Sequence, residues 1–330
     1  MGESARMAIP PATDAASLAD RLIARDLGAA PAAVNLVENR RRRAESAVLL
    51  ERVAAGLGAE AIAPAHVVGV TGPPGAGKST LLSALTRAWR ARDRTVAVLA
   101  VDPSSKRSGG ALLGDRARID SDPADRGLFI RSMAAGERLG GLAPATRAAA
   151  QALAAAFDVV VIETVGVGQS ETDVADASDT VAVVVQPGSG DALQFIKSGI
   201  MEIPDVLVIT KSDLGQVAVR ARRDLLAALR SLGARGTAVV SVSSVPPPTG
   251  IDDLVDALDA HRASLDVTAR RIQARRLGAL ADYVAEHGER GLRALGGRRA
   301  AVSFLMDQPA ALAESALVRA LENLARHPPA

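Results

Sequence analysis

Short apolar runs alternate with amphipathic stretches along the central part of the chain, from His66 to about Ala263. The runs are rich in Val and Ile and show little polar alternation, which indicates strands buried on both faces of a parallel sheet. They are His66–Val70, Thr95–Val101, Val159–Glu163, Val181–Gln186, Val206–Thr210 and Ala238–Val242. The helices expected between them are Thr80–Arg92, Pro144–Ala156, Val217–Leu232 and Ile251–Arg262. This order predicts an α/β fold with a mostly parallel, doubly wound central sheet flanked by helices.

The N-terminal part of the chain is expected to be helical. Ala15–Arg25 and Ala33–Gly56 carry apolar residues at helical spacing. Residues 1–65 are therefore interpreted as a tail followed by a helical extension, ahead of the α/β domain at 66–263.

Residues 264–330 form a second helical extension, because the strand pattern stops there. Apolar side chains share helix faces in two groups, Leu277, Leu280 and Val284 in the first and Leu317, Leu321 and Leu324 in the second. Large apolar residues are too few for this arm to fold alone. We expect it either to pack on the α/β domain or to complete its core with a second chain.

Composition excludes several classes of protein. The 330 residues are 48% hydrophobic and 23% charged, without a run of about 18 apolar residues, so we expect a globular chain without a membrane span. No signal sequence is apparent and Cys is absent, which fits the cytoplasm. The formal net charge of +2 does not suggest a nucleic-acid partner, and the basic run Arg40–Arg43 is better explained as a solvated helix face than as an anion site.

Lysine is rare in this chain. Only four of the 39 basic residues are Lys, namely Lys78, Lys106, Lys197 and Lys211. Lysines that persist in so Arg-rich a sequence are candidates for sites that need a compact ammonium group.

The segment that follows the first predicted strand fits the pattern G-x-x-x-x-G-K-[ST] and precedes a predicted helix, which is the context this phosphate-binding loop requires. Its backbone N–H groups and the helix N-terminus are expected to surround phosphate oxygens. Lys78 would bridge the β- and γ-phosphates as a catalytic residue, and the Ser79 hydroxyl would ligate Mg²⁺. The predicted binding residues are Gly72, Pro73, Pro74, Gly75, Ala76, Gly77, Lys78, Ser79 and Thr80.

Carboxylates at two strand ends complete a candidate magnesium site. Asp102 follows one predicted strand and Glu163 ends another, and oxygen ligands are those that Mg²⁺ prefers. Asp115, in the loop 103–127, is a third candidate ligand. Each of the three could instead have an ordinary structural role, which for Glu163 would be a helix or loop salt bridge. Glu163 is a candidate either as a ligand of the metal or as the carboxylate that contacts the attacking water.

Two glycines follow Glu163 in the sequence. Such a segment can move so that the Gly166 N–H meets a γ-phosphate and retreats when the phosphate leaves. Gln169 either orients the attacking water, as a third catalytic residue beside Lys78 and Glu163, or is a solvated loop side chain.

Thr210, Lys211 and Asp213 follow another buried strand and resemble the [NT]-K-x-D element of GTPases. A carboxylate there accepts hydrogen bonds from the N1–H and N2–H₂ groups of guanine, whereas adenine has no matching donors. Because the first position is Thr rather than the more usual Asn, we expect a looser brace for the base pocket. Backbone N–H groups of Ser243, Ser244 and Val245 are the candidate donors to guanine O6.

The chain resembles the MeaB/ArgK-type GTPases that accompany adenosylcobalamin-dependent acyl-CoA mutases, and the resemblance covers roughly Asn35 to Arg262. The segments that carry it are Asn35–Asn39, Gly72–Ser79, Val101–Ser105, Gly109–Asp115, Phe129–Met133, Leu139–Ala143, Glu163–Glu171, Pro187–Asp191 and Gly199–Glu202. The C-terminal arm matches only loosely. The resemblance implies Mg²⁺-dependent GTP hydrolysis, with GTP or GDP bound, coupled to cofactor loading and protection of a mutase of the methylmalonyl-CoA mutase type. It also implies a homodimer formed through the C-terminal helices, and a segment Gln186–Lys197 that signals the nucleotide state.

Two other functions fit the same phosphate site. An ATP-dependent kinase or transport-associated ATPase would prefer ATP, and Asp213 argues against it. A metallochaperone GTPase for nickel enzymes would need Cys and His clusters. Cys is absent and the four His residues are scattered, at His66, His261, His287 and His327.

Overall fold

A computed structural model provides the structure of the protein. It describes residues 14–56, 65–102, 119–134, 142–164, 170–188, 204–231, 233–234 and 236–327, except for the side chains of Asp102 and of residues 170–172.

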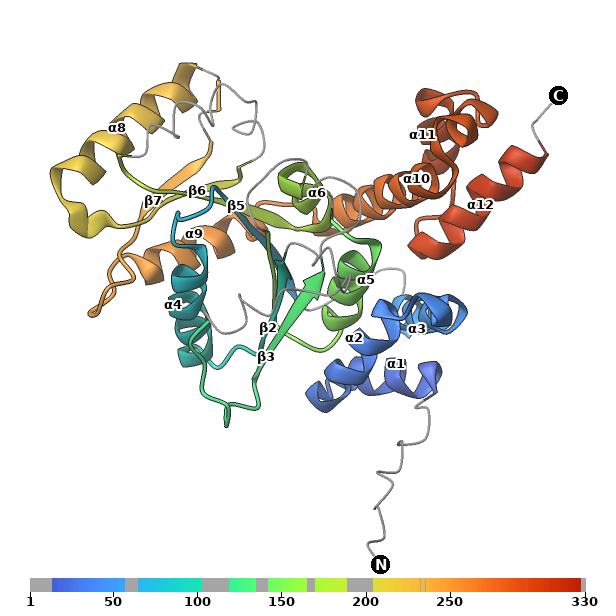
Figure 1. Ribbon diagram of the computed structural model, residues 1–330, viewed down its shortest axis with the longest axis horizontal. Helices are drawn as coiled ribbons and strands as arrows, with labels where there is room; N and C mark the ends of the chain where they lie inside the picture. Colours follow the sequence, from blue (N-terminus) through green and yellow to red (C-terminus); the bar gives the residue numbers. More distant parts are fainter. Residues whose placement is uncertain are drawn as a thin grey trace, which may run out of the picture.

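A seven-stranded sheet forms the centre of the molecule, with the strand order β3-β2-β4-β1-β5-β6-β7 (Figure 1). All six strand pairings are parallel. The strands are β1 (His66–Thr71), β2 (Val96–Asp102), β3 (Leu128–Ala134), β4 (Val159–Glu163), β5 (Thr180–Val185), β6 (Val206–Ile209) and β7 (Ala238–Ser241). The predicted α/β class with a parallel central sheet is therefore confirmed.

Strand β3 was absent from the prediction, although the other six strands agree with it to within a residue or two. It lies at the edge of the sheet and pairs only with β2. Arg131 and Ser132 interrupt its apolar residues, and most of the strand is only half-buried. An edge strand of this kind lacks the continuous Val and Ile run by which buried strands were recognised.

Helices cover both faces of the sheet. On one face lie α4 (Lys78–Ala91) and α9 (Ile251–Ala263), whose buried side chains include Trp89 and Leu254. On the other face lie α5 (Pro144–Leu153), α6 (Ser170–Ala177) and α8 (Gln216–Ser231). Because the central strands are buried between helices, a chain with few aromatic side chains fills its core with Val, Leu, Ile and Ala.

Three N-terminal helices pack behind α5: α1 (Ala15–Ile23), α2 (Ala30–Glu38) and α3 (Arg43–Gly56). Their apolar residues belong to the same buried cluster as one face of the sheet. The run Ala33–Gly56 forms two helices, because the chain leaves α2 at Asn39. There the Asn39 side chain accepts a hydrogen bond from the Arg41 N–H at 3.1 Å and starts a short 3₁₀ turn, Arg40–Arg42. Asn commonly competes with a helix in this way.

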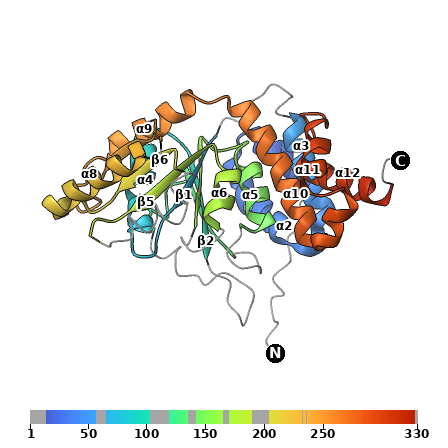
Figure 2. The same cartoon turned by 90° about the horizontal axis from the view of Figure 1, so that it is seen from above.

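The C-terminal arm consists of α10 (Val267–Ala294), α11 (Arg298–Met306) and α12 (Glu314–Arg326), which stand together beside α2, α3 and α5 (Figure 2). Helix α10 is interrupted at Gly288, where φ is +62°. The arm has a buried apolar cluster of its own, which includes Leu280, Tyr283, Leu317 and Leu321. No helix among the described ranges combines the length and the apolar character needed to cross a lipid bilayer.

A buried ionic cluster joins the arm to the α/β domain. The Arg147 guanidinium of α5 donates from Nε to Glu314 Oε1 at 3.2 Å and from Nη2 to Asp282, and Gln151 Nε2 donates to Glu314 Oε2 at 2.9 Å. Arg147 and Glu314 are 8% exposed. Burial raises the pKa of the Glu314 carboxyl and that of the Asp282 carboxyl, against the opposing effect of Arg147.

Candidate nucleotide-binding site

The strand order arranges the predicted site residues in a row along the carboxyl edge of the sheet. Asp102 and Glu163 end β2 and β4, and the glycine-rich loop follows β1 in the middle of the sheet. The Thr210–Asp213 segment follows β6, on the opposite side of the loop, and Ser243 follows β7. Ligands of open α/β sheets bind outside this edge, at the point where the strand order reverses. The candidate metal ligands and the candidate base pocket therefore flank the phosphate loop on opposite sides.

The glycine-rich loop between β1 and α4 is held in a conformation that only glycine adopts easily. Gly72, Gly75 and Gly77 have φ values of +142°, +78° and +88°. A Cβ atom at Gly72 would lie 2.0 Å from the Val184 carbonyl oxygen, so the loop passes directly over β5. Pro74 and Gly75 are exposed at the outer side of the loop, whereas Pro73 and Ala76 are buried.

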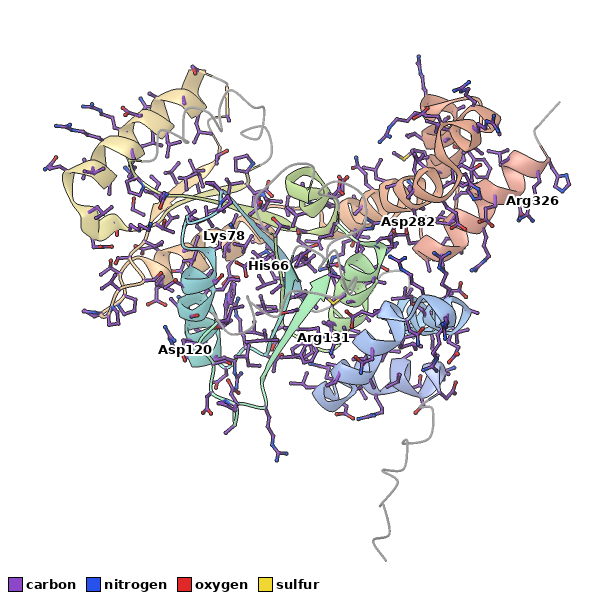
Figure 3. The ribbon with its side chains drawn as sticks, in the orientation of Figure 1. His66, Lys78, Asp120, Arg131, Asp282 and Arg326 are labelled. Atoms are coloured by element: carbon purple, nitrogen blue, oxygen red, sulfur yellow. The ribbon has the colours of Figure 1, made fainter. Side chains whose placement is uncertain are left out.

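Lys78 begins α4 and turns its side chain back over this loop (Figure 3). Its ammonium group donates to the carbonyl oxygens of Gly72 at 2.7 Å and Pro73 at 3.1 Å. The residue is 8% exposed, so its positive charge lies in a largely desolvated position beside the helix N-terminus. Charges at such positions act strongly on a neighbouring anion.

Ser79 and Glu163 meet at the metal side of the loop. The Ser79 hydroxyl donates to Glu163 Oε1 at 3.2 Å, and Glu163 is 3% exposed. Next to them the Thr164 hydroxyl donates to Thr71 Oγ1 at 2.9 Å, which ties the ends of β4 and β1 together. Thr80, one residue further along α4, is exposed.

Thr210 braces the loop from the base side. Its hydroxyl donates to the Ala76 carbonyl oxygen at 2.7 Å and also lies 3.1 Å from the Val185 carbonyl oxygen. The expectation of a looser brace was wrong for this contact, because the shorter Thr side chain still reaches the loop. Lys211 follows with a left-handed backbone, φ +53°, and its ammonium group donates to the Gly75 carbonyl oxygen at 3.3 Å.

Asp213 is exposed, and its carboxylate is oriented by Ser243, whose hydroxyl donates to Asp213 Oδ1 at 2.8 Å. The Ser243 N–H donates to the Thr249 carbonyl oxygen at 3.0 Å, and the Val245 N–H donates to Ser243 Oγ at 3.3 Å. The Ser243 and Val245 N–H groups are thus engaged within the protein, and the role of Ser243, Ser244 and Val245 as donors to guanine O6 stays a prediction.

Gln186 was missed as a residue of this site. Its side-chain oxygen accepts from Lys211 Nζ at 2.5 Å, which connects the end of β5 to the base side. The rule that polar residues at the carboxyl ends of parallel strands gather at one edge would have pointed to it.

Some predicted residues cannot be placed. Asp115, Gly166 and Gln169 lie outside the described residues, and so does Lys197. For Asp102 only the backbone is described, at the end of β2.

Comparison with known proteins identifies the family. The family model described as "Methylmalonyl Co-A mutase-associated GTPase MeaB" matches residues 30–290. The chain belongs to this family. The resemblance found from the sequence motifs is thereby confirmed, and the chain is a P-loop GTPase, an enzyme that binds GTP and GDP.

Individual relatives of this MeaB-family chain agree with the assignment. It is 46% identical over 219 residues to a Pyrococcus abyssi protein that has GTPase in its name, with 64% of this chain and 67% of the relative covered. It is 43% identical over 202 residues to the mouse methylmalonic aciduria type A homolog, which is named as mitochondrial, with 58% of this chain and 48% of that protein covered. A crystal structure named as a LAO/AO transport system kinase matches with a TM-score of 0.62 and 29% identity, over 97% of this chain and 99% of that one.

Proposed function

We propose that this GTPase is a chaperone and regulator of an adenosylcobalamin-dependent acyl-CoA mutase of the methylmalonyl-CoA mutase type, gating the loading of the cofactor and protecting the loaded enzyme. The observation that carries the proposal is the match of a mutase-associated family model over residues 30–290, which includes the whole nucleotide site and much of α10. The mouse relative named for methylmalonic aciduria supports the same partner. We place this activity in the cytoplasm.

The proposal includes a magnesium ion. The neighbouring Ser79 hydroxyl and Glu163 carboxylate provide two oxygen atoms at the end of the phosphate loop, and this donor set suits a hard cation. Ser79 and Glu163 would hold the ion, directly or through water, with Asp102 and Asp115 as further candidates. When bound, Mg²⁺ neutralises charge on the β- and γ-phosphates.

The residues of the chain would then divide the work of hydrolysis. The loop 72–80 binds the phosphates through the backbone N–H groups of its residues other than Pro73 and Pro74, and Lys78 stabilises the charge that develops on the transferred group. Glu163 and Gln169 position the attacking water, and the Gly166 N–H meets the γ-phosphate. Thr210, Lys211 and Asp213 hold the base, with the segment Ser243–Val245 as the candidate donor to its O6.

Replacing Asp213 by Asn tests the base pocket. The carboxylate that accepts from guanine becomes an amide that matches the O2 of xanthine, so we expect GTP affinity to fall by about tenfold to a hundredfold and xanthosine triphosphate to bind better than before. Titration calorimetry with both nucleotides measures the change. Asp224→Asn, at another exposed Asp of the same region, is the control and should bind as the wild type does.

The same titration, repeated with ATP, separates a GTPase from an ATP-dependent kinase, the second function suggested by the name of the solved relative. A kinase specific for ATP would bind ATP more tightly than GTP and would be insensitive to Asp213→Asn. That result would remove Asp213 from the base pocket.

We further propose that the protein is a homodimer whose contacts are made by the 264–330 arm, and that residues 1–65 and 66–263 are the helical extension and the GTPase domain. Sedimentation of the full chain and of a chain ending at residue 263 tests this division. The same number of chains per particle for both would contradict a dimerisation role for the arm.

The mutase role is tested with a purified adenosylcobalamin-dependent methylmalonyl-CoA mutase. GTP hydrolysis should rise saturably as the mutase is added, because binding energy from a partner can complete the catalytic arrangement. Cofactor transfer to the apo-mutase should depend on GTP. The chaperone role would be rejected if the hydrolysis rate did not change with added mutase and cofactor transfer did not depend on GTP. The GTPase assignment would remain intact.

A further inference from the structure

A cavity of about 170 Å³ lies where the arm meets the α/β domain. Its walls come from α3, α5, the end of α6, α10 and the segment before α12, and Figure 2 shows these helices gathered on one side of the sheet. Val67, the second residue of β1, also lines it. The cavity is therefore near the amino ends of the strands, whereas the phosphate loop follows the carboxyl end of β1, about 16 Å away along the strand.

We call this space the joint cavity. Four arginines line it, namely Arg147, Arg270, Arg271 and Arg275. Three of them have carboxylate partners within 4 Å: Arg147 pairs with Glu314 and Asp282, Arg270 with Asp205 at 3.2 Å, and Arg271 with Asp179 at 2.5 Å.

Arg275 differs from the other three. Its guanidinium donates to the backbone carbonyl oxygen of Ala310 at 2.8 Å, and among the described residues no carboxylate lies within ion-pair distance of it. Burial lowers the pKa of Arg275, and the neighbouring positive charge of Arg271 lowers it further. The carboxylate of Glu314 acts on Arg275 in the opposite sense, although it does not lie within ion-pair distance.

Three carboxylates also line the cavity. Asp179 and Glu314 are already bonded to Arg271 and Arg147, and Asp176 is exposed to solvent. None of the three is paired with Arg275, so the guanidinium remains available to a ligand with a negative charge.

The remaining walls are mainly apolar. They include Leu50, Val53 and Ala54 of α3 and Ala150 of α5. An apolar cavity of about 150 Å³ is large enough to hold benzene. A ligand that fills the space at the joint must therefore have a compact apolar body as well as the charged end that Arg275 requires.

From this combination we propose that the joint cavity is a binding site for a small organic anion. The ligand is a carboxylate or phosphate ester with an apolar body about the size of one aromatic ring. Arg275 lies at its charged end and α3 along its apolar side. The site is separate from the nucleotide site and independent of the proposed mutase partner. An anion bound there contacts the α/β domain and the arm at once.

Calorimetric titration of the full-length protein with benzoate tests the proposal, with GDP and Mg²⁺ saturating so that the phosphate loop is filled. Benzoate should bind saturably with one site per chain. Benzamide has the same shape without the charge, and inorganic phosphate has charge without the apolar body, so both should bind at least about tenfold more weakly. Phenyl phosphate in place of benzoate decides between a carboxylate and a phosphate ester.

Two variants locate the binding. Arg275→Gln should weaken benzoate binding by about tenfold or more. Arg276→Gln is the matched control, because the Arg276 guanidinium bonds to the Gln308 carbonyl oxygen and not to the cavity, and it should bind as the wild type does. Ala54→Leu fills the apolar wall and should abolish binding while Arg275 is intact.

Unchanged GDP affinity shows that each variant is folded. The proposal is overturned by equal binding of benzoate and benzamide, by benzoate binding that survives both Arg275→Gln and Ala54→Leu, or by no saturable binding of benzoate or phenyl phosphate up to about 10 mM.

Discussion

Lys78→Ala is expected to lower the rate of GTP hydrolysis by about 10³-fold, the loss typical when a preorganised group that stabilises transition-state charge is removed. Lys78 is 8% exposed and its ammonium group donates to the Gly72 and Pro73 carbonyl oxygens, so its charge acts where water screens it poorly. No other Lys or Arg in the described residues is bonded to these two carbonyls. Phosphate release at saturating GTP measures the effect.

Arg87→Ala is the matched control for this experiment. Arg87 is an exposed cation on the same helix, α4, and pairs with Asp120 at the surface. Its removal should leave hydrolysis unchanged, because exposed ion pairs contribute little. Turnover of Lys78→Ala within a few-fold of wild type, in protein with a wild-type circular dichroism spectrum, would mean that the phosphate-loop lysine does not stabilise the reaction.

Arg147→Met is expected to destabilise the protein by about 3–5 kcal/mol at neutral pH, the range observed when one partner of a buried ion pair is removed. The substitution leaves Glu314 and Asp282 buried without the guanidinium that both bond. Urea denaturation measures the free energy of unfolding. Arg299→Met, at an exposed position of α11, should change it by no more than about 0.5 kcal/mol.

The loss of stability caused by Arg147→Met should be smaller at acidic than at neutral pH. Burial already raises the pKa of Glu314 and of Asp282, and without Arg147 both pKa values should rise further. A carboxyl group whose pKa is higher in the folded than in the unfolded state favours folding below its unfolded pKa, and this contribution is lost as the pH rises through the folded pKa. The loss in free energy of unfolding caused by Arg147→Met should therefore shrink as the pH is lowered from neutral. Adding Glu314→Gln to the variant should also remove part of this loss. A penalty that is constant with pH and unaffected by Glu314→Gln would show that lost packing, not the charge, is responsible.

The central sheet and the phosphate loop were predictable because their signals are local. Buried parallel strands such as β5 are continuous Val and Ala runs, and the loop requires glycine where φ is positive, as at Gly77. Strand β3 escaped because Arg131 makes it look like a loop, and its strand character comes from pairing with β2. Pairing of that kind is not visible in a single segment.

Contacts between distant segments were the other limit. Nothing near Arg147 in the sequence distinguishes it from a solvated arginine on an Ala-rich helix, yet its partner Glu314 lies 167 positions away. The same holds for the hydroxyl of Thr210, whose acceptor Ala76 is 134 positions away. The type of residue at position 210 was known. Whether its side chain reaches the loop depends on the strand order, in which β5 lies between β1 and β6.

The chain has a single Trp and a single Tyr, and the fold puts them in different parts of the molecule. Trp89 is fully buried near the end of α4, the helix that starts at the phosphate loop, whereas Tyr283 is in the apolar cluster of the arm, with its hydroxyl 3.3 Å from the Gly291 carbonyl oxygen. Tryptophan fluorescence excited at long wavelength thus reports on the core beside the sheet, and tyrosine absorbance on the cluster of α10–α12. The unmodified protein has two optical probes, one for each side of the joint, and no label is needed to learn whether the two sides melt together.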